Sequence, residues 1–421
     1  MLLRRRHPAH MASATRHPVT EGSCDQSPQA SSNATRDRPL RVAMVAGEAS
    51  GDALGAGLMH ALRVADNDVV FEGIGGPNMI ATGFNSWFEM DRLSIMGFVE
   101  VLGRLFELIA MRRTLYQRLT ANPPDLFVGI DAPDFNLALE YRLHASGLPV
   151  VHYVSPQVWA WRQRRVRAMA RGIDLVLTLF PFETRVYHEH GMQARFVGHP
   201  MADEIKPDAQ ALPARVALGV DTTGPVLALL PGSRFSEVRR LTDDMLSAAA
   251  RLAEKTEGLS VLVPCATDRI HRFIASRTTD LDFNLRLFDG QARSVVTASN
   301  VALVASGTAT LETALIGRPM VILYRMNNLT FTLLQRLVKV PHVGLPNLLC
   351  GARVAPEYLQ DQIEPDQVCR DLLRLLKPGP DRDAVLQRFG QLHRDLARNA
   401  SAGAAAAIME LLSQRSRAGQ G

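Results

Sequence analysis

Cysteine is scarce in this chain of 421 residues, which contains only four. They are Cys24, Cys265, Cys350 and Cys369, and no two of them form a C-x-x-C pair. Such spacing argues against a disulfide framework or a zinc site and is typical of reduced cytosolic thiols. Long apolar runs are also lacking. No stretch reaches the roughly 18 apolar residues that a membrane-spanning helix needs, so none is predicted.

The positive charge is concentrated at the N-terminus. Six arginines and three acidic residues lie in the first 38 positions, which gives this segment a net charge of +3. The other residues therefore carry only +2 of the formal net charge of +5. That excess is too small to indicate nucleic-acid binding. Residues 1–38 are rich in Ser, Arg, Pro and Gln and have no apolar signal-peptide segment. We therefore expect them to be either a disordered tail or an over-extended start of the sequence.

Apolar, β-branched runs alternate with helical patterns in both halves of the chain. The expected strands are 40–46, 69–74, 126–130, 150–154, 173–177 and 194–197 in the first half, and 226–230, 259–263, 285–288, 301–304 and 320–323 in the second. This alternation predicts an α/β fold with two Rossmann-like, doubly wound parallel domains facing across a cleft.

The domain boundaries follow from changes in this pattern. We expect a first domain at 39–200, a polar, proline-containing linker at 201–224 and a second domain at 225–380. The helices of 381–421 are expected either to pack back on the first domain or to be exchanged with a second subunit in a homodimer. The alanine-rich last helix is too weak to be stable without packing on something.

Two turns in the second half are suited to binding an anion. One strand continues through Ser306-Gly307-Thr308 into a helix, whose N-terminus offers free N–H groups and a positive dipole end. Arg234, in the turn Pro231-Gly232-Ser233-Arg234, offers a planar fork of donors for phosphate. Glu312 could accept hydrogen bonds from ribose hydroxyls. The alternatives are an ordinary strand–helix junction and, for Arg234, a surface ion pair.

In the first half, acidic residues follow two predicted strands. The turn 47–52 matches neither the dinucleotide-binding G-x-G-x-x-G pattern nor a P-loop, so neither NAD nor ATP is indicated. Glu48 and Ser50 would lie beyond the carboxyl end of the first strand, where ligands of such sheets bind. Asp131 ends another strand, where a catalytic base would be placed. The alternatives are that Glu48 offsets the helix dipole and that Asp131 is an N-cap, although Asp134 is better placed to be one.

The segment 95–113 is more apolar than a surface helix requires. It has one narrow polar stripe, and most of its other positions are apolar, among them Val99, Leu102, Leu105 and Phe106. Two interpretations remain open. In the first, the segment is a helix that is buried on two sides or lies in a dimer interface. In the second, it meets a bilayer surface or holds acyl chains, with nearby arginines at lipid headgroups.

Other patterns give weaker signals. Two of the three tryptophans, Trp159 and Trp161, precede a run of arginines that begins with Arg162. Aromatic residues interleaved with arginines can bind nucleic acid, but a single such helix between α/β units fits a phosphate or lipid headgroup better. The D-x-D triplets at 66–68 and 280–282 precede strands, and the two histidines of 188–190 diverge on a helix. No metal site is therefore expected.

Seven short motifs, in order from about residue 41 to the C-terminus, resemble those of the lipid-A-disaccharide synthases, bacterial glycosyltransferases of the two-domain GT-B type. They are GEASGD at 47–52, VGIDAPDF at 128–135, HYVSP at 152–156, VWAWR at 158–162, LLPGSR at 229–234, ASGTA at 305–309 and LPNLL at 345–349. The resemblance covers all of the chain except the N-terminal tail.

The resemblance implies an inverting transfer in which UDP-2,3-diacylglucosamine donates its sugar to the 6-hydroxyl of 2,3-diacylglucosamine 1-phosphate. Such a displacement needs a base for the acceptor and charge stabilisation for the departing UDP. Asp131 or Glu48 would be the base. Groups expected at UDP are Arg234, Ser233, Ser306, Gly307, Thr308 and Glu312, and the resemblance adds Asn347.

The resemblance also favours the lipid interpretation of 95–113, since both implied substrates are acylated. Residues expected at the acceptor or at lipid are Ser50, Val99, Leu102, Leu105, Phe106, Trp161 and Arg162. The resemblance further implies a cytoplasmic enzyme held peripherally at the inner membrane, with no cofactor. The alternatives are another GT-B-like enzyme that uses UDP-N-acetylglucosamine, as a lipid-acceptor transferase or a 2-epimerase, and a non-catalytic protein that binds lipid or sugar nucleotide.

Overall fold

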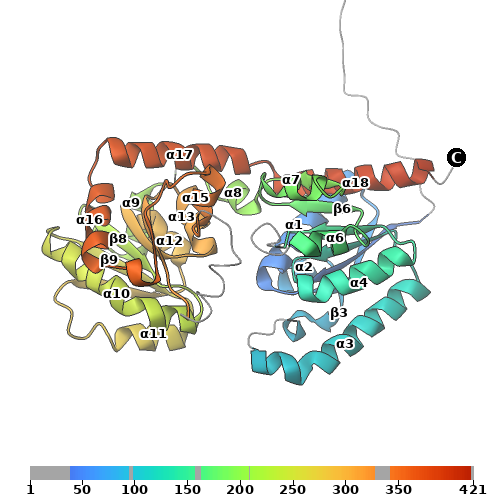
Figure 1. Ribbon diagram of the computed structural model, residues 1–421, viewed down its shortest axis with the longest axis horizontal. Helices are drawn as coiled ribbons and strands as arrows, with labels where there is room; N and C mark the ends of the chain where they lie inside the picture. Colours follow the sequence, from blue (N-terminus) through green and yellow to red (C-terminus); the bar gives the residue numbers. More distant parts are fainter. Residues whose placement is uncertain (1–37, 94–97, 157–162, 208, 328–341, 419–421) are drawn as a thin grey trace, which may run out of the picture. The chain divides into compact units, whose positions relative to one another are not determined.

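The chain folds around two parallel β-sheets (Figure 1). The computed structural model describes residues 38–93, 98–156, 163–207, 209–327 and 342–418, and for 98–105 and 163–164 it describes the backbone alone. Each sheet has helices in its connections, as parallel strands require. The doubly wound α/β class predicted from the alternating pattern is confirmed.

The first sheet has seven parallel strands in the order β3-β2-β1-β4-β5-β6-β7. Their bounds are β1 Leu40–Ala46, β2 Val69–Gly75, β3 Asn85–Glu89, β4 Leu126–Ile130, β5 Val150–Tyr153, β6 Leu175–Thr178 and β7 Ala194–Phe196. The central strands β4, β5 and β6 are buried at every position. This burial explains why they read as continuous apolar runs without alternation.

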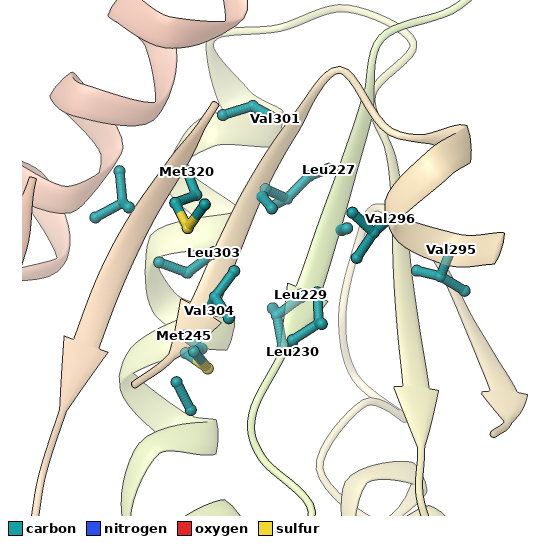
Figure 2. Close-up of a cluster of buried hydrophobic side chains, with 14 of the residues drawn as sticks. Leu227, Leu229, Leu230, Met245, Val295, Val296, Val301, Leu303, Val304 and Met320 are labelled. Atoms are coloured by element: carbon teal, nitrogen blue, oxygen red, sulfur yellow. The ribbon is translucent and has the colours of Figure 1, made fainter. Parts of the chain in front are cut away.

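The second sheet has six strands in the order β10-β9-β8-β11-β12-β13. Their bounds are β8 Val226–Leu230, β9 Ser260–Cys265, β10 Asn284–Asp289, β11 Val301–Ala305, β12 Met320–Tyr324 and β13 Glu357–Leu359. Figure 2 shows the apolar core around its central strands, where Leu227, Leu229, Leu303 and Val304 are packed with Met245 of a covering helix.

The described helices connect and cover these sheets. With the first sheet are α1 Ala49–Ala65, α2 Pro77–Ala81, α3 Phe98–Ala121, α4 Pro133–Ala145, α6 Gln163–Met169 and α7 Glu183–His188. Next in the chain are α8 Pro200–Glu204, α9 Ala211–Leu218, α10 Phe235–Glu254, α11 Asp268–Ala275, α12 Ala292–Ala298, α13 Thr308–Leu315, α15 Leu345–Cys350, α16 Pro365–Leu376, α17 Pro380–Leu396 and α18 Ala400–Ala418. Short 3₁₀ turns span Met90–Arg92 and Gln360–Gln362.

The last two helices join different cores. Helix α17 contacts α13, α15 and α16, and its Phe389 is fully buried in the core of the second sheet. Helix α18 packs on α1, and its Ile408 is fully buried in the core of the first sheet. The chain therefore leaves the first core near residue 200 and returns to it with its last helix. The segment 201–224, expected to be a linker, contains α8 and α9, and α9 packs on α12 of the second core.

The two passages between the cores are hydrogen bonded to each other. The His199 N–H donates to the Leu396 carbonyl at 2.9 Å. Asp203 accepts bonds from the backbone N–H groups of Asn399 at 2.8 Å and Ala400 at 2.6 Å, at the start of α18. Burial lowers the pKa of His199 to about 4, so its imidazole is neutral near pH 7.

Each sheet has a point where the strand order reverses. In the first sheet the chain adds β2 and β3 on one side of β1 and then continues on the other side with β4. In the second sheet the same reversal falls between β8 and β11. Ligands of open parallel sheets bind beyond the carboxyl ends of the strands at such a switch point. These two places are where the predicted site residues must be sought.

Candidate functional site

At the first switch point, the turns after β1 and β4 approach each other closely. Ala46 pairs with Ile130 in the sheet, so Glu48 and Asp131 follow neighbouring strand ends. A Cβ atom on Gly47 would lie only 2.6 Å from the Ala132 Cβ, so any larger residue at 47 would push the turns apart. Glu48 is exposed at the N-cap position of α1 and makes no side-chain capping bond. Its carboxylate is therefore available to a ligand.

Asp131 stands in a strained turn. Its φ of 50° and the φ of 43° at Ala132 place two consecutive non-glycine residues in the left-handed region, which they rarely occupy. The Asp131 N–H donates to the Tyr153 carbonyl at 2.8 Å, and the Asn136 amide donates to the Asp131 carbonyl at 2.9 Å. The half-buried Asp131 carboxylate accepts no hydrogen bond from the described residues. Strain of this kind clusters at functional sites.

The N-cap expected at Asp134 is wrong. Helix α4 begins at Pro133, so its N-cap is Ala132, which has no capping side chain. Asp134 lies in the first turn instead, where its exposed carboxylate pairs with Arg165. Proline at the first helical position explains the earlier start, because its fixed φ suits that position.

The first motif divides between exposed and structural residues. Ser50 is exposed in the first turn of α1, at the same end of the sheet as Glu48. Asp52 is fully buried and accepts bonds from the backbone N–H groups of Gly76 at 2.9 Å and Asn78 at 2.8 Å. Asp52 therefore holds the turn after β2 rather than a ligand.

Behind the Asp131 turn lies a fully buried acid–histidine pair. Glu140 of α4 and His152 of β5 are joined at 2.7 Å between Oε1 and Nδ1. The second carboxylate oxygen of Glu140 and the Nε2 atom of His152 have no hydrogen-bond partner in the part of the chain that the structure describes. Asn136, which clamps the Asp131 turn, lies one helical turn before Glu140. The pair thus supports the element that positions Asp131.

At the second switch point, the turns after β8 and β11 lie at the same sheet edge, because Leu230 pairs with Val304. Arg234 is the N-cap residue of α10, and its side chain is 68% exposed. Its described ion pair is a loose one with Glu237 at 3.3 Å. Ser233 is exposed beside it. Arg234 can therefore turn its guanidinium toward a ligand at this edge.

The turn Ser306-Gly307-Thr308 leads into α13, as predicted. Gly307 and Thr308 are exposed, and their N–H groups have no hydrogen-bond partner among the described residues. The Ser306 N–H donates to the Leu323 carbonyl at 2.8 Å, and the Thr310 N–H donates to the Gly307 carbonyl at 3.1 Å. The Ser306 hydroxyl donates to the Val343 carbonyl at 3.0 Å. The turn therefore offers backbone N–H groups to an anion, while the Ser306 side chain holds a neighbouring loop.

Two further predicted residues already have protein partners. The Glu312 carboxylate accepts a bond from Arg293 Nε at 2.7 Å. Asn347 is fully buried, and its amide bonds the Ala355 backbone and Glu357. Glu357 in turn accepts bonds from the N–H groups of Val343 and Gly344, both at 2.9 Å. Asn347 thus anchors the loop that also contacts Ser306.

Sequence reasoning missed Arg293 and Glu357. Arg293 lies on α12, and its hydrogen bond to Glu312 raises its pKa. Glu357 lies in the short edge strand β13, which no apolar run announces. Arg293 and Glu312 lie on different helices, α12 and α13, so their pairing appears only in the folded chain. No local sequence signal could have found Arg293 or Glu357.

The predicted lipid segment is described only in part. The side chains of Val99, Leu102 and Leu105 lie outside the described residues, and so do Trp161 and Arg162. Phe106 on α3 is 83% exposed and Ile109 is 49% exposed. The part of α3 whose side chains are described therefore presents large apolar side chains to solvent.

The described residues contain neither a membrane-spanning helix nor a cluster of metal-binding side chains. No helix there is long and apolar enough to cross a membrane. Within the same residues, no three histidine, cysteine or acidic side chains gather as they would around a metal ion.

Solved structures with the same fold include sugar-nucleotide enzymes. The UDP-N-acetylglucosamine 2-epimerase of Neisseria meningitidis has a TM-score of 0.60 at 13% identity, with 89% of this chain and all of that chain covered. The kitacinnamycin glycosyltransferase has a TM-score of 0.59 at 16% identity, with 89% and 100% covered. At such identities the likeness concerns the GT-B fold alone.

Sequence relatives are much nearer. The family described as lipid-A-disaccharide synthetase matches residues 42–408. The lipid-A-disaccharide synthase of Pseudomonas syringae pv. tomato is 50% identical over 374 residues, which cover 89% of this chain and 98% of the relative. The enzyme of that name in Pseudomonas putida is 50% identical over 376 residues, covering 89% and 99%. The chain belongs to the lipid-A-disaccharide synthase family.

Proposed function

We propose that the two switch points divide one inverting glycosyl transfer between them, with the acceptor at the first and the nucleotide at the second. The family makes the chain a glycosyltransferase of lipid A biosynthesis. Its proposed substrates are UDP-2,3-diacylglucosamine and 2,3-diacylglucosamine 1-phosphate. The observation that carries the proposal is the Asp131 carboxylate, which stands without a described partner on a strained turn at a switch point.

Asp131 is proposed as the general base. It takes the proton of the acceptor 6-hydroxyl as that oxygen bonds to the anomeric carbon, while the bond from that carbon to the diphosphate breaks and UDP leaves with the electron pair. The rigid turn supports this role, because a base acts only when its geometry is fixed relative to the reacting hydroxyl. Glu48, on the neighbouring turn, is proposed to accept a hydrogen bond from the acceptor sugar and to orient it, with Ser50 beside it.

The second switch point is proposed to hold the leaving group. Arg234, Ser233 and the N–H groups of Gly307 and Thr308 would offset the charge that develops on the diphosphate. The Glu312–Arg293 pair would face the ribose, with Glu312 as acceptor. Asn347 is proposed to act through the loop it anchors, since its own amide is already bonded to Ala355 and Glu357.

Helix α3 is proposed to meet the acyl chains and the inner-membrane surface. Exposed Phe106 and Ile109 support this proposal, because large apolar side chains on a charged helix are typical of an interfacial helix. An enzyme bound to the membrane surface in this way would reach both lipid substrates without a membrane-spanning segment.

The assay that tests the function measures UDP release in detergent. We expect release only when both acylated sugars are present. Release from the nucleotide sugar alone would instead indicate an epimerase-like reaction, and no release from the pair would exclude the proposed transfer.

The base is tested with Asp131→Asn. We expect turnover to fall about a hundredfold or more, since the amide cannot take the proton and a general base contributes roughly that much. Asp134→Asn is the matched control, because that carboxylate is exposed three residues away, and we expect it to stay within about twofold of the parent. If the Asp131 variant turned over substrate about as fast as the control, another residue would have to be the general base.

A further inference from the structure

A cationic cavity lies between α3 and α4, two helices of the first sheet's connections. The two helices pack side by side (Figure 1). The cavity has a volume of about 410 Å³ and is lined by Ile109, Arg112, Arg113, Ala138 and Arg142. Three of these five residues are arginines and none is acidic. This volume is within the range of small-molecule sites, roughly 300–1,000 Å³.

The three guanidinium groups have no carboxylate partner in the described part of the chain. Arg112 lies over the Phe135 ring at 5.1 Å and donates to the Asp134 carbonyl at 3.1 Å, while its buried Nε atom has no hydrogen-bond partner among the described residues. Arg142 lies over the Tyr116 ring at 3.9 Å. Many other arginines of this chain pair with a carboxylate, as Arg41 does with Glu72. The cavity therefore has uncompensated positive charge.

These charges also act on one another. Burial lowers the pKa of the Arg112 guanidinium, and the nearby charge of Arg142 lowers it further. An arrangement that brings like charges together without a counter-ion is unfavourable by itself, and an anion between them would relieve it. The arginine side chain offers planar, paired N–H donors, which match the oxygens of a phosphate group.

We propose that this cavity binds the phosphate group of an acylated lipid. The phosphate is indicated by the three guanidinium groups, none of which has a carboxylate partner among the described residues. The acyl part is indicated by Phe106 and Ile109, which are exposed on α3 next to the cavity and would contact the apolar chains of the same molecule. The choice of a lipid over a free phosphate rests on the proposed function.

Two lipids carry the required chemistry. One is a phospholipid of the bilayer surface, which would fix the enzyme at the membrane. The other is the glycolipid acceptor, whose 1-phosphate would be held while its sugar reaches the first switch point. The experiment is arranged so that its two arms separate these sources.

The test variant is the double substitution Arg113→Gln with Arg142→Gln. Arg112 is left in place because it packs on Phe135 and bonds the start of α4. The control is Arg388→Gln with Arg417→Gln, which removes the same charge from exposed arginines without a described partner. Far-UV circular dichroism and thermal melting establish that both variants are folded.

In the first arm, binding is measured by co-sedimentation with phosphatidylcholine vesicles that contain phosphatidylglycerol, or oleate at the same surface charge. We expect the parent protein to prefer the phosphate-bearing vesicles and the test variant to lose about fivefold in affinity for each arginine, if the site takes bilayer lipid. This arm contains no nucleotide sugar, so its result does not depend on the transferase function.

In the second arm, KM is measured for a short-chain, monodisperse acceptor without vesicles. A KM at least fivefold higher in the test variant, with kcat unchanged, would assign the cavity to the acceptor phosphate. A loss in the vesicle arm alone would assign it to bilayer phospholipid. The proposal is overturned if neither arm changes, if the control loses as much as the test variant, or if a loss in vesicle binding is equal for phosphate and oleate and KM is unchanged.

Discussion

Gly129 is a glycine because the Glu140 carboxylate occupies the space of a side chain. It lies in the buried strand β4, opposite His152 of β5. A Cβ atom at this position would overlap Glu140 Oε1, the oxygen that is bonded to His152. A methyl group there must displace the acid from its partner or move the helix that carries it.

We therefore predict that Gly129→Ala destabilises the fold by about 2–4 kcal/mol, through overpacking and through separation of a buried hydrogen-bonded pair. Denaturant unfolding measures the change. Gly390→Ala is the control, because that glycine lies in helix α17 with its nearest would-be contact at 3.5 Å. The control should be neutral or slightly stabilising, since alanine favours a helix. Equal stability of the two variants would contradict this account of Gly129.

The sequence was informative about single residues where they follow a strand directly. Asp131 and Glu48 could be selected because the carboxyl ends of parallel strands share one edge of the sheet. Pattern could not show that Asp52 and Asn347 are buried, because a polar residue in a turn looks the same whether it faces a ligand or the interior. Their burial and their hydrogen bonds depend on segments distant in the sequence, Gly76 for one and Glu357 for the other.

At the scale of elements, the buried strands were predicted well, and of the four edge strands β7 and β10 were predicted while β3 and β13 were missed. β1, β4 and β8 begin and end at the expected residues because all of their positions except Arg41 are apolar or small. β3 and β13 were missed because they are short edge strands with polar residues. They form by pairing with the neighbouring strands β2 and β12, and a local sequence pattern does not show such pairing.

Asp52 connects two elements, and its removal should be costly. Each of its oxygens accepts two bonds, Oδ1 from Gly76 and Met79 at 2.9 and 3.0 Å, and Oδ2 from the Asn78 backbone and side chain at 2.8 and 2.9 Å. The substitution Asp52→Asn places an N–H₂ group where two donors point. We predict a loss of about 2–3 kcal/mol in the free energy of unfolding, because buried charge-assisted bonds are lost.

The measurement is again denaturant unfolding, with Asp68→Asn as the control. The Asp68 side chain is exposed in the loop before β2 and has no described hydrogen bond, so its variant should match the parent. If Asp52→Asn were as stable as this control but inactive, Asp52 would have to contact a substrate rather than the turn after β2.

At the scale of the whole molecule, the two C-terminal helices separate. Helix α17 completes the second core and α18 completes the first, although only three residues stand between them. The first core is therefore built from both ends of the folded chain. Composition could show that the alanine-rich α18 needs a partner, but the choice of α1 depends on small residues meeting in space, such as Gly57 opposite Ser401.

This arrangement predicts that core substitutions in the two helices act on different sheets. Ile408→Ala and Phe389→Ala each remove a fully buried side chain and should cost about 2–5 kcal/mol locally. Hydrogen exchange measured by mass spectrometry should show faster exchange in β1 and β4 for Ile408→Ala, and in β8 and β11 for Phe389→Ala. If both variants accelerated exchange in the same sheet, the assignment of α17 and α18 to separate cores would be wrong. If the effect of Ile408→Ala depended on protein concentration, α18 would be exchanged between subunits, because only an intermolecular contact responds to dilution.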